Sequence, residues 1–164
     1  MDTIYFDNAS TTFPKPRAVP DAMYDYMTRV GSNVNRGCYE RAYGVEELVY
    51  DTRERISRLF DGPACKNVVF TRNITESLNV LHKGFLRPGD HVITSSMEHN
   101  AVMRPLVQLE QQGVSFTRAA CNPDGTLNPA ELERALRPNT RAVVMTHGSN
   151  VCGTLLPIQE VGAF

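Results

Sequence analysis

The sequence lacks the features that mark several common classes of protein. No run approaches the roughly 20 apolar residues of a membrane-spanning helix, and the N-terminal MDTIYFDNAS has neither the basic nor the apolar region of a secretory signal. The formal net charge is -1, with acidic and basic residues mixed along the chain, so no charged face suggests nucleic acid or an anionic membrane surface. We therefore expect a cytoplasmic protein that binds neither nucleic acid nor a membrane.

Metal and nucleotide signatures are missing as well. The four cysteines lie far apart, without a CxxC pair or a histidine at ligand spacing, so neither a metal site nor a disulfide framework is expected. Cys38 and Cys152 stand inside motifs, but we interpret both as small buried residues. Neither GxGxxG nor GxxxxGK followed by Ser or Thr occurs, which argues against a nucleotide-binding α/β protein.

The sequence instead contains helical and strand patterns in alternation. Apolar residues at helical spacing predict a long amphipathic helix over 45–60, and Pro14 and Pro16 precede another helix that starts near Arg17. Strands are predicted at 67–71, 91–95, 114–118 and 141–146, the last of them buried, and helices at 75–85, 100–112 and 128–136. This alternation implies an α/β fold with a mainly parallel sheet flanked by helices.

Three strand ends carry candidate ligand-binding residues. Thr75 and Glu76 start a helix, where free backbone N–H groups and the helix dipole would favour a phosphate, although Thr75 could equally serve only as the helix cap. His99 could lie against a flat cofactor ring, exchange protons, or be a surface histidine beside a helix. Asn150 follows the third strand. Since ligands of open parallel sheets bind beyond the carboxyl ends of the strands, we expect these residues to face one crevice.

In this order, and over essentially the whole chain, the motifs resemble those of the cysteine desulfurases, within the class V aminotransferase family. YFDNASTT resembles the N-terminal Asp-Asn-Ala-Ser-Thr-Thr segment of those enzymes, and SNVNRG resembles their Asn-x-x-Arg-Gly loop. The resemblance implies that four residues lie on the substrate side of the site: Asn8, Ala9, Asn35 and Arg36.

The same resemblance implies a set of residues that bind pyridoxal 5'-phosphate. The phosphate-binding turn of the family corresponds to Ile74, Thr75 and Glu76, where Ile74 is bulkier than usual and is expected to act through its backbone. His99 corresponds to the histidine that stacks on the cofactor ring and is the candidate for proton transfer. Asn150 corresponds to the asparagine beside the phenolic oxygen of the cofactor.

The implied fold is the large domain of a fold type I pyridoxal-phosphate enzyme, a group whose members are usually homodimers. A helix that begins after Pro157 stops at Phe164 without a cap, so we expect the chain to end within a domain. Residues 1–15 are then an extended segment near the substrate, and 16–164 an incomplete cofactor-binding domain that stops before the Schiff-base lysine. The chain alone is expected to be inactive and to bind the cofactor weakly or not at all.

Lysine content supports this expectation. The three lysines, Lys15, Lys66 and Lys83, lack the sequence context of the Schiff-base lysine, and Lys83 is expected on the exposed side of its helix. For the full-length parent the resemblance implies conversion of L-cysteine to L-alanine, with sulfur passed as a persulfide to an acceptor protein. The alternatives are a class V aminotransferase or another lyase acting on a small amino acid, and, from a different class, a noncatalytic phosphate-binding or dimerisation module.

Overall fold

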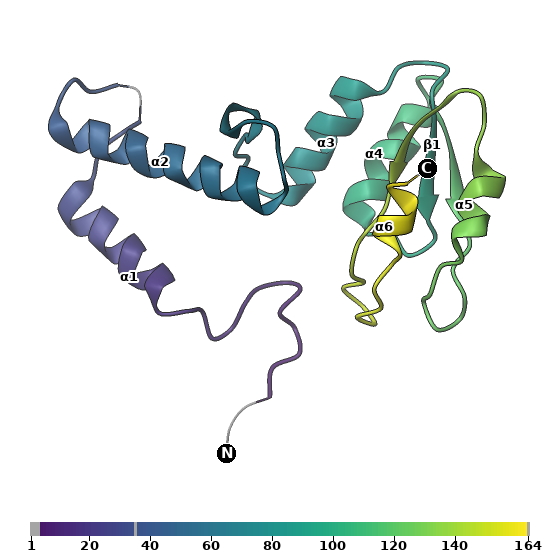
Figure 1. The fold of residues 1–164 in the computed structure, drawn as a ribbon, viewed down its shortest axis with the longest axis horizontal. Helices are drawn as coiled ribbons and strands as arrows, with labels where there is room; N and C mark the ends of the chain where they lie inside the picture. The colour runs from purple at the N-terminus through teal and green to yellow at the C-terminus, as the bar shows by residue number, and fades with distance from the viewer. Residues whose placement is uncertain (1–3, 35, 164) are drawn as a thin grey trace. The chain divides into compact units, whose positions relative to one another are not determined.

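The computed structural model describes residues 4–34 and 36–163, and its contacts divide the chain into two compact units, Met1–Phe70 and Thr71–Phe164 (Figure 1). Within the part of the chain that the structure describes, no helix is long and apolar enough to cross a membrane. The expected division into a segment 1–15 and a domain 16–164 stays a prediction.

The N-terminal unit is built from helices. Helix α1 (Ala18–Asp25) runs into a π-helical turn η1 (Tyr26–Val30), which ends at Gly31, where φ is 52° and the N–H bonds to the Tyr26 carbonyl. A positive φ is a conformation that glycine adopts without steric cost, so this residue ends the helix. Helix α2 (Glu40–Leu59) follows and buries Ala42 and Val45. The helices predicted near Arg17 and over 45–60 are therefore confirmed.

The strand predicted for 67–71 is wrong. Cys65–Asn67 forms the short 3-10 helix η2, and the apolar side chains that suggested a strand are exposed, with Val69 at 76% and Phe70 at 49%. A strand needs a neighbour to receive its backbone hydrogen bonds. The described residues form a single sheet of strands β1, β2 and β3, all of which lie later in the chain, and none of them pairs with this segment.

The C-terminal unit is an α/β structure around a parallel sheet in the order β2-β1-β3. In chain order its elements are α3 (Ile74–Phe85), β1 (His91–Ser95), α4 (Asn100–Glu110), β2 (Ser115–Ala119), α5 (Pro129–Ala135), β3 (Thr140–Val144) and α6 (Ile158–Val161). These elements confirm the predicted α/β class and the parallel sheet, with boundaries within about two residues of those expected. The expectation that β3 is buried is wrong, because this edge strand alternates between half-buried and exposed residues.

Two apolar clusters cover the two faces of this sheet. Consecutive residues of a strand point to opposite faces, and Val92 and Ile93 of β1, both fully buried, belong to different clusters. The first cluster contains side chains of α4 and its neighbours: Leu86, Val92, Val102, Leu106, Leu109 and Val114. The second contains Ile93, Ala119, Leu127, Leu132 and Leu156. The central strand is therefore buried on both sides, as expected for a parallel sheet.

His91 of β1 links the three strands by hydrogen bonds to both neighbouring strands at one end of the sheet. Its Nδ1 hydrogen-bonds the Thr140 hydroxyl of β3 at 2.8 Å, and its Nε2 hydrogen-bonds the Thr117 hydroxyl of β2 at 2.9 Å. Burial lowers the pKa of His91, and the positive charge of Arg137 lowers it further. The ring is therefore neutral at pH 7, with one nitrogen donating and the other accepting.

Candidate active site

The first turn of α3 is closed by a local hydrogen-bond exchange. The Asn73 side chain accepts the Glu76 N–H at 2.9 Å, and the Glu76 carboxylate accepts the Arg72 N–H at 2.8 Å. The Arg72 backbone and side-chain hydrogen bonds lower the pKa of Glu76, which therefore stays ionised. The helix cap is Asn73, so the interpretation of Thr75 as the cap is wrong, and Glu76 has a structural task.

Two backbone donors at the start of α3 remain available. The N–H groups of Ile74 and Thr75 have no hydrogen-bond partner among the residues that the structure describes. Ile74 as a residue is 69% exposed. Free N–H groups at the positive end of a helix dipole favour an anion, and phosphate binding at this helix start stays a prediction.

His99 caps α4 through its ring. The Ala101 N–H donates to His99 Nδ1 at 3.0 Å, so in the neutral ring the proton lies on Nε2. The cap fixes the orientation of an otherwise exposed imidazole and leaves the Nε2–H group free to contact a ligand. This local role for His99 had no sequence signal, because histidine is not among the preferred capping residues.

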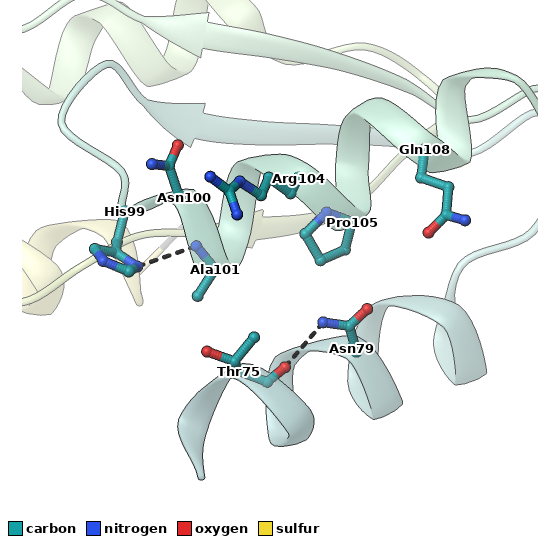
Figure 2. A pocket seen from close by; sticks show the side chains of 8 residues that line it. All are labelled: Thr75, Asn79, His99, Asn100, Ala101, Arg104, Pro105 and Gln108. Carbon is teal, nitrogen blue, oxygen red and sulfur yellow. Dashed lines mark hydrogen bonds between the residues drawn. The ribbon is translucent and has the colours of Figure 1, made fainter.

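Thr75 and His99 line the same pocket, of about 340 Å³, between α3 and α4 (Figure 2). Six further residues complete its wall: Asn79, Asn100, Ala101, Arg104, Pro105 and Gln108. In Figure 2 the side chains of Thr75 and Asn79 point from α3 toward α4, and the Asn79 amide donates to the Thr75 carbonyl at 2.9 Å. Two of the candidates from the sequence are thus brought together, although Thr75 precedes β1 and His99 follows it.

Arg104 contributes positive charge to this pocket and was missed by the sequence analysis. It stands one turn beyond Asn100, and Figure 2 shows its guanidinium directed back toward that N-terminal turn of α4. Helical side chains point toward the helix N-terminus, which explains this direction. In the described ranges Arg104 makes no ion pair. Its position four residues after Asn100 was the signal that could have identified it.

Asn150 lies in a tight turn after β3 and does not line the pocket of Thr75 and His99. The turn is stabilised by Ser149, whose N–H donates to the Thr154 carbonyl at 2.9 Å and whose carbonyl accepts the Gly153 N–H at 3.0 Å. Asn150 itself is exposed. Its role beside a cofactor stays a prediction.

The residues expected on the substrate side belong to the N-terminal unit. Asn8, Ala9 and Arg36 are exposed, and the Asn8 side chain accepts the Phe13 N–H at 3.3 Å. Asn35 lies outside the described residues. The substrate-side assignment of all four stays a prediction.

Cys38 and Cys152 are exposed, so their interpretation as buried residues is wrong. Both follow turns or loops, where a small side chain has no core to enter. Hydrogen bonds from the Ser149 side chain and from Thr154 lower the pKa of Cys152 to about 7. A substantial fraction of this thiol is therefore a thiolate at neutral pH. No cluster of three or more metal-ligating side chains occurs within 4–34 and 36–163.

No lysine is among the described residues that line the pocket. Lys83 is exposed on α3, as predicted, and does not line the pocket of Thr75 and His99. Lys15 Nζ donates to the Thr11 hydroxyl and the Thr12 carbonyl, both at 3.0 Å.

Comparison with known proteins places these features in a family context. The family model described as aminotransferase class-V matches residues 4–164. A probable cysteine desulfurase from Methanothermobacter thermautotrophicus is 32% identical over 162 residues, which cover 98% of this chain and 40% of the relative. The cysteine desulfurase IscS of Anaeromyxobacter sp. (strain K) is 36% identical over 163 residues, which cover 97% of this chain and 40% of the relative.

Solved structures agree with the sequence comparison. The apo structure of cysteine desulfurase from Thermococcus onnurineus NA1 superposes with a TM-score of 0.87 at 25% identity, covering 98% of this chain and 40% of that one. SspA in complex with cysteine gives a TM-score of 0.86 at 29% identity, covering 98% of this chain and 47% of that one. The chain thus spans about 40% of the length of these curated relatives.

Proposed function

The chain belongs to the class V aminotransferase family, and from this premise we propose that it is the N-terminal part of a pyridoxal-phosphate-dependent cysteine desulfurase. The desulfurase assignment is supported by the names of the relatives and of the structural neighbours. The reaction proposed for the whole enzyme removes sulfur from L-cysteine, leaves L-alanine, and passes the sulfur as a persulfide to an acceptor protein. A homodimer is proposed as its assembly.

The pocket of Thr75 and His99 fits the phosphate of the cofactor. A phosphate monoester carries close to two negative charges and accepts several hydrogen bonds. The pocket is lined by Thr75, which has a hydroxyl and an unpaired N–H group, and by Arg104 with its guanidinium, while the unpaired N–H group of Ile74 is next to Thr75 in the chain. All three kinds of group are donors, and the one charged side chain among the lining residues is positive. This concentration of unpaired donors is the observation that carries the proposal.

Individual residues then take distinct parts. Ile74 and Thr75 bind phosphate through their backbone, and Thr75 adds its hydroxyl, while Glu76 acts indirectly by holding the first turn of α3 in shape. His99, oriented by its bond to Ala101, presents its ring and Nε2–H to the cofactor. When bound, the cofactor supplies an electron sink for substrate carbanions. The chain's own residues bind it, orient it and hold a proton at His99 Nε2.

The remaining assignments rest on the family resemblance. Asn150 is proposed to contact the phenolic oxygen of the cofactor, and Asn8, Ala9, Asn35 and Arg36 to face a small amino-acid substrate. SspA, whose structure holds cysteine, supports cysteine as that substrate. Transamination of a small amino acid is the alternative within the same family.

Calorimetric titration of the chain with pyridoxal phosphate, inorganic phosphate and pyridoxal tests the phosphate pocket. Arg104→Gln should weaken binding of the first two ligands about tenfold, because it removes a charge-assisted hydrogen bond. Thr75→Ala should act in the same direction. Binding of pyridoxal, which has no phosphate, should not change.

Arg55→Gln is the matched control for Arg104→Gln. Arg55 is an exposed arginine of α2 with no ion pair among the described residues, so its substitution removes the same charge from another helix. Equal effects of the two substitutions, or unchanged phosphate binding in Arg104→Gln, would contradict the assignment of the pocket.

A further inference from the structure

The Glu98 carboxylate joins two loops at the carboxyl end of the sheet. Its Oε1 accepts the Ser95 hydroxyl at 2.6 Å, at the end of β1. The Thr146 N–H, two residues beyond β3, donates to Oε1 at 2.9 Å and to Oε2 at 3.1 Å. Glu98 and Thr146 are both half-buried. Hydrogen bonds to an ionised carboxylate are among the stronger ones in proteins, so this link holds the two loops firmly together.

On one side of the link stands His99. Glu98 directly precedes it, and the His99 ring is held in turn by the Ala101 N–H at the first turn of α4. A displacement of Glu98 therefore moves the backbone that carries the imidazole, while the pocket lining on α3 stays where it is.

On the other side stands the turn that carries Asn150. Between Thr146 and Leu156 the chain folds back on itself, with an isolated bridge between Gly148 and Leu155 and a 2.8 Å bond from the Leu156 N–H to the His147 carbonyl. Because these bonds make the segment stiff, the position of Thr146 determines the position of Asn150.

We propose that Glu98 is a positioning residue, which sets the place of His99 relative to Asn150. The inference rests on the proposed function for the identity of the ligand, since the group that would lie between these loops is the heteroaromatic ring of pyridoxal phosphate. The proposed phosphate-binding groups, at the start of α3 and on Arg104, make no hydrogen bond with the Glu98 carboxylate, whose partners are Ser95 and Thr146. Glu98 thus acts on the ring and leaves the anchor unchanged.

The geometry requires a carboxylate at this position. Both carboxylate oxygens lie within 3.1 Å of the Thr146 nitrogen. Either orientation of a glutamine amide therefore places its NH₂ group against the Thr146 N–H, and two donors repel each other. An aspartate is one methylene shorter and does not span the same distance.

Glu98→Gln in the otherwise unchanged chain tests the proposal. Nuclear magnetic resonance should show that the ring nitrogens of His99 and the backbone amide of Asn150 shift together, although Asn150 lies 52 positions from Glu98 in the sequence. The affinity for pyridoxal phosphate should fall about tenfold, while that for inorganic phosphate stays within about twofold. A loss of stability alone would lower both affinities to the same extent, so this split separates positioning from structural damage.

Two further variants keep the result interpretable. Glu110→Gln removes the same charge from an exposed position at the end of α4. It should leave the His99 and Asn150 resonances and the affinities for pyridoxal phosphate and inorganic phosphate unchanged. Ser95→Ala removes one of the two donors to the Glu98 carboxylate and should cause smaller shifts in the same direction. This variant keeps the proposal testable if Glu98→Gln does not fold. An Asn150 amide that stays at its wild-type position in both variants, or equal losses of affinity for both ligands, would overturn the proposal.

The inference and the proposed function fail in different ways. If the wild-type chain binds inorganic phosphate but shows no preference for pyridoxal phosphate, the proposed function is wrong. The link between His99 and Asn150 is still judged in that case, because their signals are followed in the free chain.

Discussion

The two units of the chain differ in how their helices begin and in how much apolar surface they bury. Helices α3, α4 and α5 of the C-terminal unit each have a side-chain cap, supplied by Asn73, His99 and Asn128. In the N-terminal unit α1 and α2 begin at Arg17 and Tyr39 without a side-chain cap. Side-chain caps therefore stabilise helix starts in the unit that contains the pocket.

Burial follows the same division. Both apolar clusters of the described residues lie in the C-terminal unit, and the N-terminal unit buries few apolar side chains. Many of its large apolar residues are exposed, including Phe6 at 94%, Leu59 at 76% and Phe60 at 76%. The two clusters give the C-terminal unit an apolar core, whereas exposed large apolar residues occur in both units and are more numerous in the described part of the N-terminal one.

Removal of a core side chain should have the largest effect on this comparison. Leu106 is fully buried in the first cluster, so Leu106→Ala should lower the free energy of unfolding of the C-terminal unit by about 2–5 kcal/mol. Leu48→Ala, at a 60% exposed position of α2, should change stability by less than about 0.5 kcal/mol. Hydrogen exchange measures both, at the β1 amides for Leu106→Ala and at the α2 amides for Leu48→Ala. Similar losses in the two variants would contradict the assigned core.

Helix caps should give a smaller contrast. Asn73→Ala removes the acceptor of the Glu76 N–H and should cost about 1 kcal/mol, read from exchange of the backbone-bonded amides of α3 from Ser77 on. Arg17→Ala, at the uncapped start of α1, removes only an exposed ion pair to Asp21. It should lower the stability of this helix by about 0.3 kcal/mol. Equal protection losses at the two helices would show that the caps do not distinguish the units.

The two units should differ least in how their stability depends on pH. Burial lowers the pKa of His82 and, together with Arg137, that of His91, so the unfolded chain binds protons at a higher pH than the folded unit does. Stability is thus fully present above pH of about 6.5 and falls as the pH decreases below that value. All four histidines lie in the C-terminal unit. Protonation of histidines in the unfolded chain should therefore reduce the protection of β1 amides between about pH 7.5 and 5.5 more than that of α2 amides.

His82→Leu supplies the check on the pH dependence. The Nδ1 atom of His82 is buried and has no hydrogen-bond partner in the described residues, so a leucine removes a titrating group without breaking a bond there. The variant should show a shallower decrease of protection with falling pH. An unchanged slope would mean that His82 does not contribute.

The elements that the sequence predicted well are those whose pattern is local. The run 91–95 and the helix of 45–60 were recognisable because burial and helical spacing are written into consecutive residues. The segment 67–71 has the same apolar character, but a strand also requires a partner, and nothing in the segment itself states whether one is present. The strand prediction for 67–71 therefore failed because it depends on tertiary contacts.

The site was predictable to the same degree. Thr75 was found because it stands at a helix start, and His99 because it follows a strand at the carboxyl end of the sheet. The capping role of Asn73, three residues before Glu76, was not found, because the cap was assigned to Thr75. Arg104 and Glu98 were not found. Arg104 matters only once α3 and α4 are packed side by side, and Glu98 only once Thr146, 48 positions away, is brought to it.

The central claim is that the start of α3 and the pocket beside it bind the phosphate of a pyridoxal cofactor. The most direct test follows the backbone amides of Ile74 and Thr75 and the ring nitrogens of His99 while pyridoxal phosphate is added to isotope-labelled chain. The account predicts that all three signals shift with one binding curve, and that pyridoxal without phosphate leaves the two amides unchanged. Amides of α3 that stay still while the cofactor binds elsewhere would contradict it.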